Sequence, residues 1–242
     1  YFDDLVKRLS ISGTNVLIIL SVFVGLSTAL GAIGFVYLIR YFNDLFFGLT
    51  DQLLTETIGE RGFKFWFPII PMLGGLLVGP IVYKYAAEAR GHGVPEVMNA
   101  VARLGGIIRP RVAAAKTIAS AICIGSGGSA GREGPIVQIG SAIGSTIGQV
   151  FRMSGDRVKI LVGCGAAAGI SSVFNAPIAG VIFSLEIILG DFAIKTFSPV
   201  ILSSVVASVV TRSFMGNHPA FAVPSYSLVS AWEIPLYVIL GI

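Results

Sequence analysis

The longest apolar segment, Val16–Ile39, constrains the fold of this chain more than any other feature. It holds about 24 residues and no charged side chain, which is enough for a helix to cross a bilayer. Phe67–Tyr85 is nearly as apolar and predicts a second span. Charged residues make up only 12% of the chain, against about 25% in a typical soluble domain. The sequence therefore predicts an integral membrane protein.

Beyond residue 90 the apolar segments become short and are interrupted by glycines. Four of them fall below the roughly 20 residues that a span needs: Val94–Leu104, Val112–Ile124, Ile136–Val150 and Val158–Ser171. Later apolar segments are Ala176–Leu189, Phe197–Phe214 and Ile234–Ile242. Short helices at membrane depth are tolerated where they pack inside the protein or line a cavity. We therefore expect an all-α, polytopic membrane protein with broken and re-entrant helices.

The stretch from Gly125 to Gly140 carries the strongest sign of a binding site. Its first half is rich in glycine, which lets backbone N–H groups converge because no Cβ blocks the approach. Pro135 favours a helix start near Gly134, and helix N-termini attract anions. Glu133, the only acidic residue between 97 and 155, stands at this point. An ionisable group in an apolar background is usually functional, so we expect an anion site at which Glu133 competes.

A second motif, Gly91-His-Gly-Val-Pro-Glu96, also places glycines before a proline that permits a helix start. Two such helix starts can point at one anion from different sides, as broken helices do in transporters. We expect the starts near Val94 and Gly134 to meet at a common point. His92 either donates a hydrogen bond to the anion or only caps the loop.

Three segments resemble the signature motifs of a membrane family: Gly91-His-Gly-Val-Pro95, Gly131-Arg-Glu-Gly-Pro135 and Asn175-Ala-Pro-Ile-Ala-Gly180. Their order and separations are similar to those of the CLC chloride channels and chloride/proton exchangers. The resemblance covers nearly the whole chain and mainly the first of the family's two inverted repeats. It implies transmembrane passage of chloride or a similar small anion, and a homodimer with one pathway per subunit.

The resemblance also implies roles for single residues. Glu133 corresponds to the gating glutamate of the family, and Gly134 to Ile136 would supply backbone N–H groups to the anion. The anion-binding residues it implies come from the two glycine motifs: Gly91, His92, Gly93, Val94, Pro95, Gly131, Arg132, Gly134, Pro135 and Ile136.

Two positions depart from the family pattern. The first motif usually carries Ser or Pro where this chain has His92, so the resemblance leaves the preferred anion open. In exchangers an acidic residue directly follows the position of Glu186 and relays protons from the inner side, whereas this chain has Ile187. An aliphatic side chain carries no proton, and Glu186 points about 100° away on a regular helix. We therefore expect uncoupled, channel-like conduction, with a proton-coupled chloride/proton antiporter as the alternative. In that alternative Glu186 and Ile187 mark the candidate inner proton-relay region, where Glu186 or water would carry the proton.

The charge distribution predicts the topology. Basic residues gather in 84–116 and acidic residues exceed basic ones in 40–66. The positive-inside rule then places 84–116 and the N-terminus in the cytoplasm, with the chain in a plasma or inner membrane. We expect an amphipathic cytoplasmic lead at 1–13, the first repeat at 14–230 and a truncated start of the second repeat at 231–242.

Other functional classes fit the sequence less well. A nucleotide-binding enzyme loop ends in Gly-Lys-Ser/Thr, which Gly131-Arg-Glu does not provide. No basic cluster with interleaved aromatic residues indicates nucleic-acid binding. Cys123 and Cys164 stand apart in apolar segments, so we expect buried thiols, no metal site and no cofactor. A purely structural membrane protein would leave Glu133 unexplained.

Several further residues have a structural and a functional interpretation. The glycines at 140, 144, 148, 163, 165 and 169 form either a helix-packing face, which we favour, or a pore wall. Gly75 and Gly79 suggest another close-packing face. Asn175 is expected to cap the helix that follows it, and Glu186 lies either at an aqueous boundary or beside an arginine.

Overall fold

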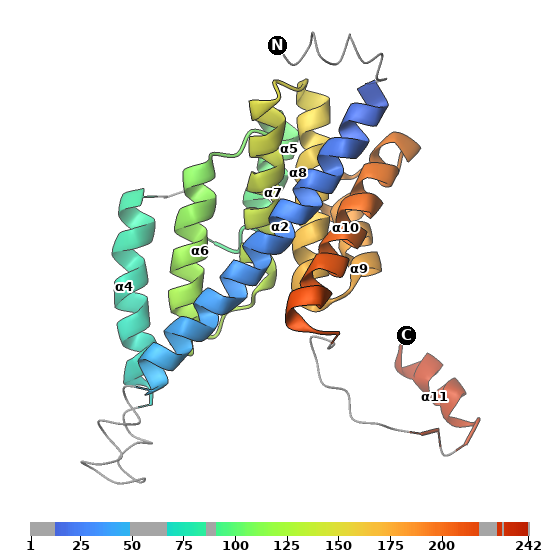
Figure 1. Ribbon diagram of the computed structural model, residues 1–242. Coiled ribbons are helices and arrows are strands. Elements are labelled where there is room, and N and C mark those ends of the chain that lie inside the picture. The colour runs from blue at the N-terminus through green and yellow to red at the C-terminus, as the bar shows by residue number, and fades with distance from the viewer. Residues whose placement is uncertain (1–12, 49–66, 86–90, 218–226, 229, 242) are drawn as a thin grey trace.

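The computed structural model describes residues 13–48, 67–85, 91–217, 227–228 and 230–241. Within these ranges every regular element is a helix, which confirms the all-α prediction (Figure 1). The α-helices are α2 (Gly13–Asn43), α4 (Ile69–Tyr85), α5 (Val94–Arg103), α6 (Pro110–Gly125), α7 (Glu133–Val150), α8 (Gly155–Phe174), α9 (Pro177–Phe183), α10 (Ile194–Met215) and α11 (Glu233–Leu240). The π-helical turns η1 (Asp44–Gly48) and η3 (Ser184–Leu189) directly extend α2 and α9.

Three helices are long and apolar enough to cross a membrane: Asn15–Gly48, Gly155–Phe174 and Ile194–Met215. The prediction that the segment around Val158–Ser171 is too short was wrong, because α8 has 20 residues and includes polar turns at both ends. The predicted span at Phe67–Tyr85 is a helix of 17 residues, just below the usual spanning length. Helices α5, α6 and α9 are short, as the interrupted apolar pattern indicated.

Helices α7 and α8 form the centre of the fold and run antiparallel. Five glycines set this contact. On α7, a Cβ on Gly140, Gly144 or Gly148 would meet the Gly165 carbonyl, the Leu161 carbonyl or Val158, respectively. On α8, a Cβ on Gly165 or Gly169 would meet the carbonyl of Gly140 or Ile136. Absent side chains let the two backbones approach closely. The structure thus confirms the packing interpretation of these glycines.

Long helices α2 and α10 pack on α8, and α2 also contacts α6 and α7 as it crosses the bundle (Figure 1). A Cβ on Gly25 of α2 would lie 2.5 Å from the Ser203 carbonyl oxygen of α10. Serines satisfy buried carbonyls across the interface, since Ser203 donates to the Cys164 carbonyl at 3.0 Å and Ser171 donates to the Ser204 carbonyl at 2.8 Å. Cys164 is fully buried, as expected, while Cys123 is half-buried.

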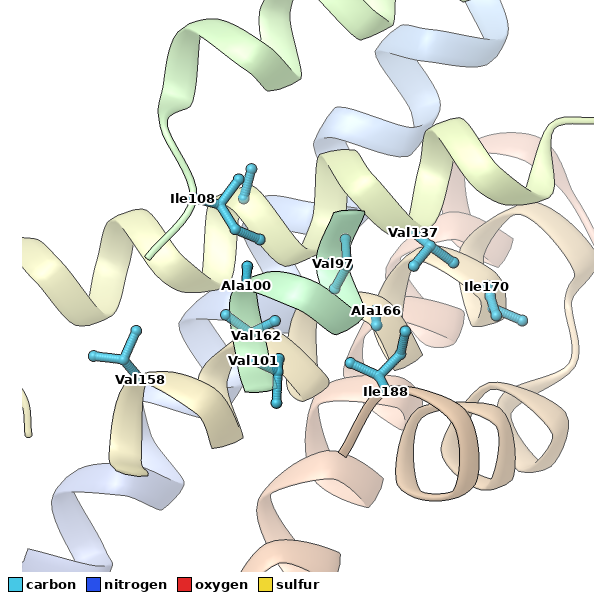
Figure 2. Packing of buried hydrophobic residues seen from close by; sticks show 11 residues of the cluster. Val97, Ala100, Val101, Ile108, Val137, Val158, Val162, Ala166, Ile170 and Ile188 are labelled. Carbon is cyan, nitrogen blue, oxygen red and sulfur yellow. The ribbon is translucent and has the colours of Figure 1, made fainter. Parts of the chain in front are cut away.

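Helix α5 lies along α7 and points the same way. Its start contacts the start of α7, since a Cβ on Gly93 would lie 2.8 Å from the Gly134 carbonyl oxygen. The loop after its end is held near the other half of α7, because the Ser145 hydroxyl donates to the Gly106 carbonyl and accepts from the Ile108 N–H. Figure 2 shows the apolar cluster beneath α5, in which Val97, Ala100 and Val101 meet side chains of α7, α8 and η3.

Two local predictions need correction. A Cβ on Gly75 or Gly79 would meet nothing within 4 Å, whereas one on Gly74 would overlap the Ser126 side chain, so Gly74 makes the close contact between α4 and α6. Asn175 does not cap the following helix. It ends α8 in the left-handed conformation (φ 55°), which asparagine tolerates better than most residues. Its side chain accepts a hydrogen bond from Arg212 Nε and donates one to Asn217.

Most of the predicted cytoplasmic lead at 1–13 and most of the acidic segment at 40–66 lie outside the described residues. The final helix α11 stands apart from the bundle in Figure 1, and all its residues are at least partly exposed.

Candidate functional site

The first glycine motif forms a loop that starts helix α5. Gly91 and Gly93 adopt positive φ angles of 88° and 96°, a region that L-residues with side chains rarely occupy. The helix begins at Val94, with Pro95 in its first turn and the Gly93 carbonyl accepting from the Val97 N–H at 3.2 Å. The loop therefore needs both glycines for its path, and His92 between them is exposed.

The second glycine motif connects α6 to α7. Gly127 has a φ of 85°, and the Gly128 N–H donates back to the Cys123 carbonyl at 2.9 Å, so the chain turns sharply after α6. Helix α7 begins at Glu133, one residue before the predicted start, with half-buried Arg132 preceding it. Glycine and proline chemistry thus sets both helix starts locally.

The two helix starts meet, which confirms the predicted convergence. A Cβ on Gly134 would overlap the His92 carbonyl oxygen, and one on Gly93 would lie 2.9 Å from Gln138 Oε1. The first loop therefore rests directly on the first turn of α7. The contact follows from the parallel arrangement of α5 and α7, which brings two N-termini with partial positive charge to one place.

Not every predicted N–H donor remains available for an anion. Pro135 has no N–H, and the Ile136 N–H donates to the Arg132 carbonyl at 3.1 Å. The donors without an intrahelical acceptor at this end of α7 are those of Glu133 and Gly134. The Ile136 side chain is fully buried in a cluster with Phe35, so it packs the helix rather than facing a ligand.

Glu133 stands at the start of α7 with an exposed side chain. Its carboxylate folds over Gly131, where a Cβ would overlap Glu133 Oε2. Gly131 thus leaves the space in which the carboxylate lies. An exposed acid at a helix N-terminus is electrostatically favourable and can still reach solvent.

A cavity of about 350 Å³ connects the two loops and lies against α4 and α6. Among the predicted site residues, Gly91, His92, Gly131 and Pro135 line it. The remaining predicted anion-site residues lie at the two helix starts beside it: Gly93, Val94, Pro95, Arg132, Gly134 and Ile136.

Lys116 is a candidate site residue that the sequence analysis grouped with the basic residues of 84–116. It belongs to α6, is only 6% exposed, and donates from Nζ to the Gly91 carbonyl at the edge of the cavity. A lysine inside the apolar segment Val112–Ile124 was the available signal, because buried ionisable groups in such segments are usually paired and functional.

Glu186 and Ile187 both lie in the π-helical turn η3, where each is exposed and Ile187 is 39% accessible. Neither residue lines the cavity between the two loops. Single π-helical turns within α-helices occur often at functional sites. Over the described ranges, no group of three or more His, Cys, Asp or Glu residues is placed to hold a metal ion.

A family model described as "Voltage gated chloride channel" matches residues 74–242. A Ralstonia nicotianae protein named as a ClcB-like chloride channel protein is 35% identical over 224 residues, which cover 90% of this chain and 52% of the relative. The H(+)/Cl(−) exchange transporter ClcA of Salmonella arizonae is 34% identical over 232 residues, which cover 93% of this chain and 48% of ClcA.

A solved structure of a slow cyanobacterial Cl−/H+ antiporter superposes with a TM-score of 0.76 at 22% identity, covering 93% of this chain and 53% of that chain. This similarity shows the fold. The chain spans about half the length of these relatives. The family model covers more than half of the chain, and the two glycine motifs that it includes contact each other in the structure. The chain therefore belongs to the CLC family, whose model is described as voltage gated chloride channel.

Proposed function

We propose that this chain forms half of a transmembrane pathway for chloride or a similar small anion. The observation that carries the proposal is the contact of the two helix starts, at which the His92 carbonyl lies against Gly134. Two helix N-termini aimed at one point favour an anion there, as in other transporters with broken helices. The neighbouring cavity of about 350 Å³ has room for a hydrated anion.

Glu133 is proposed as the gate of this pathway. Its carboxylate stands at the end of α7 that attracts anions, so it can occupy the place of the permeant ion. Its exposure supports movement and protonation, since the side chain is not held in the core. Protonation removes the charge and lets the side chain leave, so acid is expected to open the pathway.

The coupling of anion passage to protons has two candidates. Ile187 supports uncoupled conduction, because an aliphatic residue cannot relay protons at the position that exchangers use. Coupled exchange is the second candidate, and the name of ClcA as an exchange transporter supports it. We further propose a homodimer in a plasma or inner membrane with a cytoplasmic N-terminus.

The test is an anion-efflux measurement with the full-length protein reconstituted in liposomes under a chloride gradient. Chloride efflux above that of empty liposomes, increasing as external pH falls, is the expected result. Absence of efflux from correctly inserted protein at every pH would overturn the proposal.

A further inference from the structure

A second cavity, of about 390 Å³, lies between α5, the loop that follows it, and α7. It is distinct from the cavity between the two glycine loops and shares no lining residue with it. Its walls are mostly apolar, and its polar lining comes from Glu96, Asn99, Arg109 and Gln138. None of these residues belongs to the proposed anion site.

Two residues that line this cavity each carry a buried acceptor atom with no donor among the described residues. Gln138 is 2% exposed, and its Oε1 accepts no hydrogen bond within the described part of the chain. Glu96 Oε2 is likewise buried and accepts none there. Buried polar atoms in folded proteins nearly always have a partner, so both atoms point to a ligand that donates hydrogen bonds. A cavity of this size readily holds a water molecule where polar groups supply two or more hydrogen-bond partners.

The second carboxylate oxygen of Glu96, Oε1, lies near the first glycine loop. Glu96 Oε1 lies 3.0 Å from the position of a Cβ on Gly91, and Glu96 attracts the ammonium of Lys116. Gly91 and Lys116 both line the cavity between the loops. Glu96 therefore lines one cavity and lies beside Gly91, which lines the other.

We propose that Glu96 is a proton-binding residue, reached by water in the cavity beside Gln138, and that it passes protons towards the two glycine loops. A hydronium ion there gives its proton to Glu96 Oε2, which forms the carboxylic acid and leaves water behind; the reverse step releases the proton. Glu96 would thereby provide the inner proton transfer that Ile187 cannot. This inference rests on the proposed anion pathway and takes its second candidate, coupled exchange.

The charged groups around Glu96 fit this assignment. Lys116 approaches from α6, Arg109 lines the same cavity, and His92 lines the neighbouring one. Helix α7 contributes the neutral Gln138, and η3, which packs against α5, carries Glu186. Glu96 is the only acidic residue on either cavity among the described residues, so it is the one carboxylate there that can take up a proton.

The experiment measures proton and chloride movement together, using the full-length protein in liposomes with a chloride gradient and no proton gradient. Wild-type protein is expected to move protons uphill. Glu96→Gln, which keeps the shape but cannot titrate, should reduce protons moved per chloride by about tenfold or more, as expected when a positioned proton-transfer group is removed. Chloride flux should persist, and Glu96→Asp should restore part of the proton movement.

Gln138→Leu removes a polar partner of the proposed water and leaves the Glu96 carboxylate in place. This variant should also reduce proton movement while chloride flux continues. Asp156→Asn removes an exposed carboxylate on α8 that lines neither cavity, and this control should keep wild-type coupling. Unchanged coupling in Glu96→Gln, or no uphill proton movement in the wild type, overturns the role of Glu96 even if chloride flux is normal. Should Glu96→Gln lose chloride flux as well, Gln138→Leu decides, and intact coupling in that variant overturns the inference. Absence of chloride flux in the wild type would instead refute the proposed anion pathway.

Discussion

The glycines of helix α7 make two kinds of close contact. One is with the backbone of a neighbouring helix, and the other is with a loop at the start of α7. At Gly140 and Gly144 the backbone lies against the backbone of α8, in the buried centre of the fold. At Gly134 it lies against the carbonyl of His92, beside an exposed glutamate and a cavity. The first contact joins two complete helices, whereas the second joins two helix starts. The same residue type therefore builds the scaffold in one half of α7 and the proposed site in the other.

The difference predicts that substitutions in the buried contact affect folding most. Gly165→Ala would place a Cβ onto the Gly140 carbonyl oxygen, with no flexible side chain able to move away. We expect a loss of about 3 kcal/mol or more of stability, measured as thermal unfolding in detergent. Gly79→Ala on α4, where a Cβ meets nothing within 4 Å, is the control and should be neutral or slightly stabilising. Equal stability of the two variants would show that the α7–α8 contact is not close.

In the second contact, the strongest effect is expected on function. Glu133→Gln removes the titrating charge at the start of α7 while keeping the shape of the side chain. The wild type should conduct more at low pH, where Glu133 is protonated, and less as pH rises. The variant should conduct at the high level throughout, in an efflux assay across external pH. Asp156→Asn, at an exposed position in the first turn of α8, is the control, and a pH response retained in Glu133→Gln would remove Glu133 as the gate.

A substitution in the first loop should have an intermediate effect. Gly93→Ala must adopt a φ of 96° and place a Cβ 2.8 Å from the Gly134 carbonyl oxygen. Such strain costs about 1–3 kcal/mol, so the two helix starts should separate. We expect weaker anion binding by calorimetry with the overall helix content unchanged by circular dichroism. Gly105→Ala controls for strain alone, since Gly105 also has a positive φ but no close neighbour. Equal affinity in both variants would argue against a shared site.

The smallest effect is expected at His92, whose exposed ring has two interpretations. If the ring donates to the anion, His92→Ser should change relative chloride, bromide and nitrate permeation by up to about tenfold, because a hydrogen bond to a charged group contributes about 1.5–3 kcal/mol. The measurement is the anion selectivity of efflux from liposomes. Identical selectivity would assign His92 to the loop alone.

Much of this protein follows from local sequence. The apolar segments predict a membrane protein, and the Gly/Pro motifs place the helix starts at Val94 and next to Gly134, because proline and glycine restrict the backbone at their own positions. The order of the three motifs also indicated the family. The roles of the site residues, the oligomer and the orientation in the membrane stay predictions.

Tertiary packing determined the rest. The parallel placement of α5 on α7 brings the loops together, turns Lys116 from an expected loop residue into a buried donor to Gly91, and leaves Gln138 facing a cavity. Packing elsewhere in the bundle brings Gly74, rather than Gly75, into close contact with Ser126. Asn175 ends α8 instead of capping the next helix. These features depend on which residues meet from distant parts of the chain, and neither composition nor the spacing of residues along one helix contains that information.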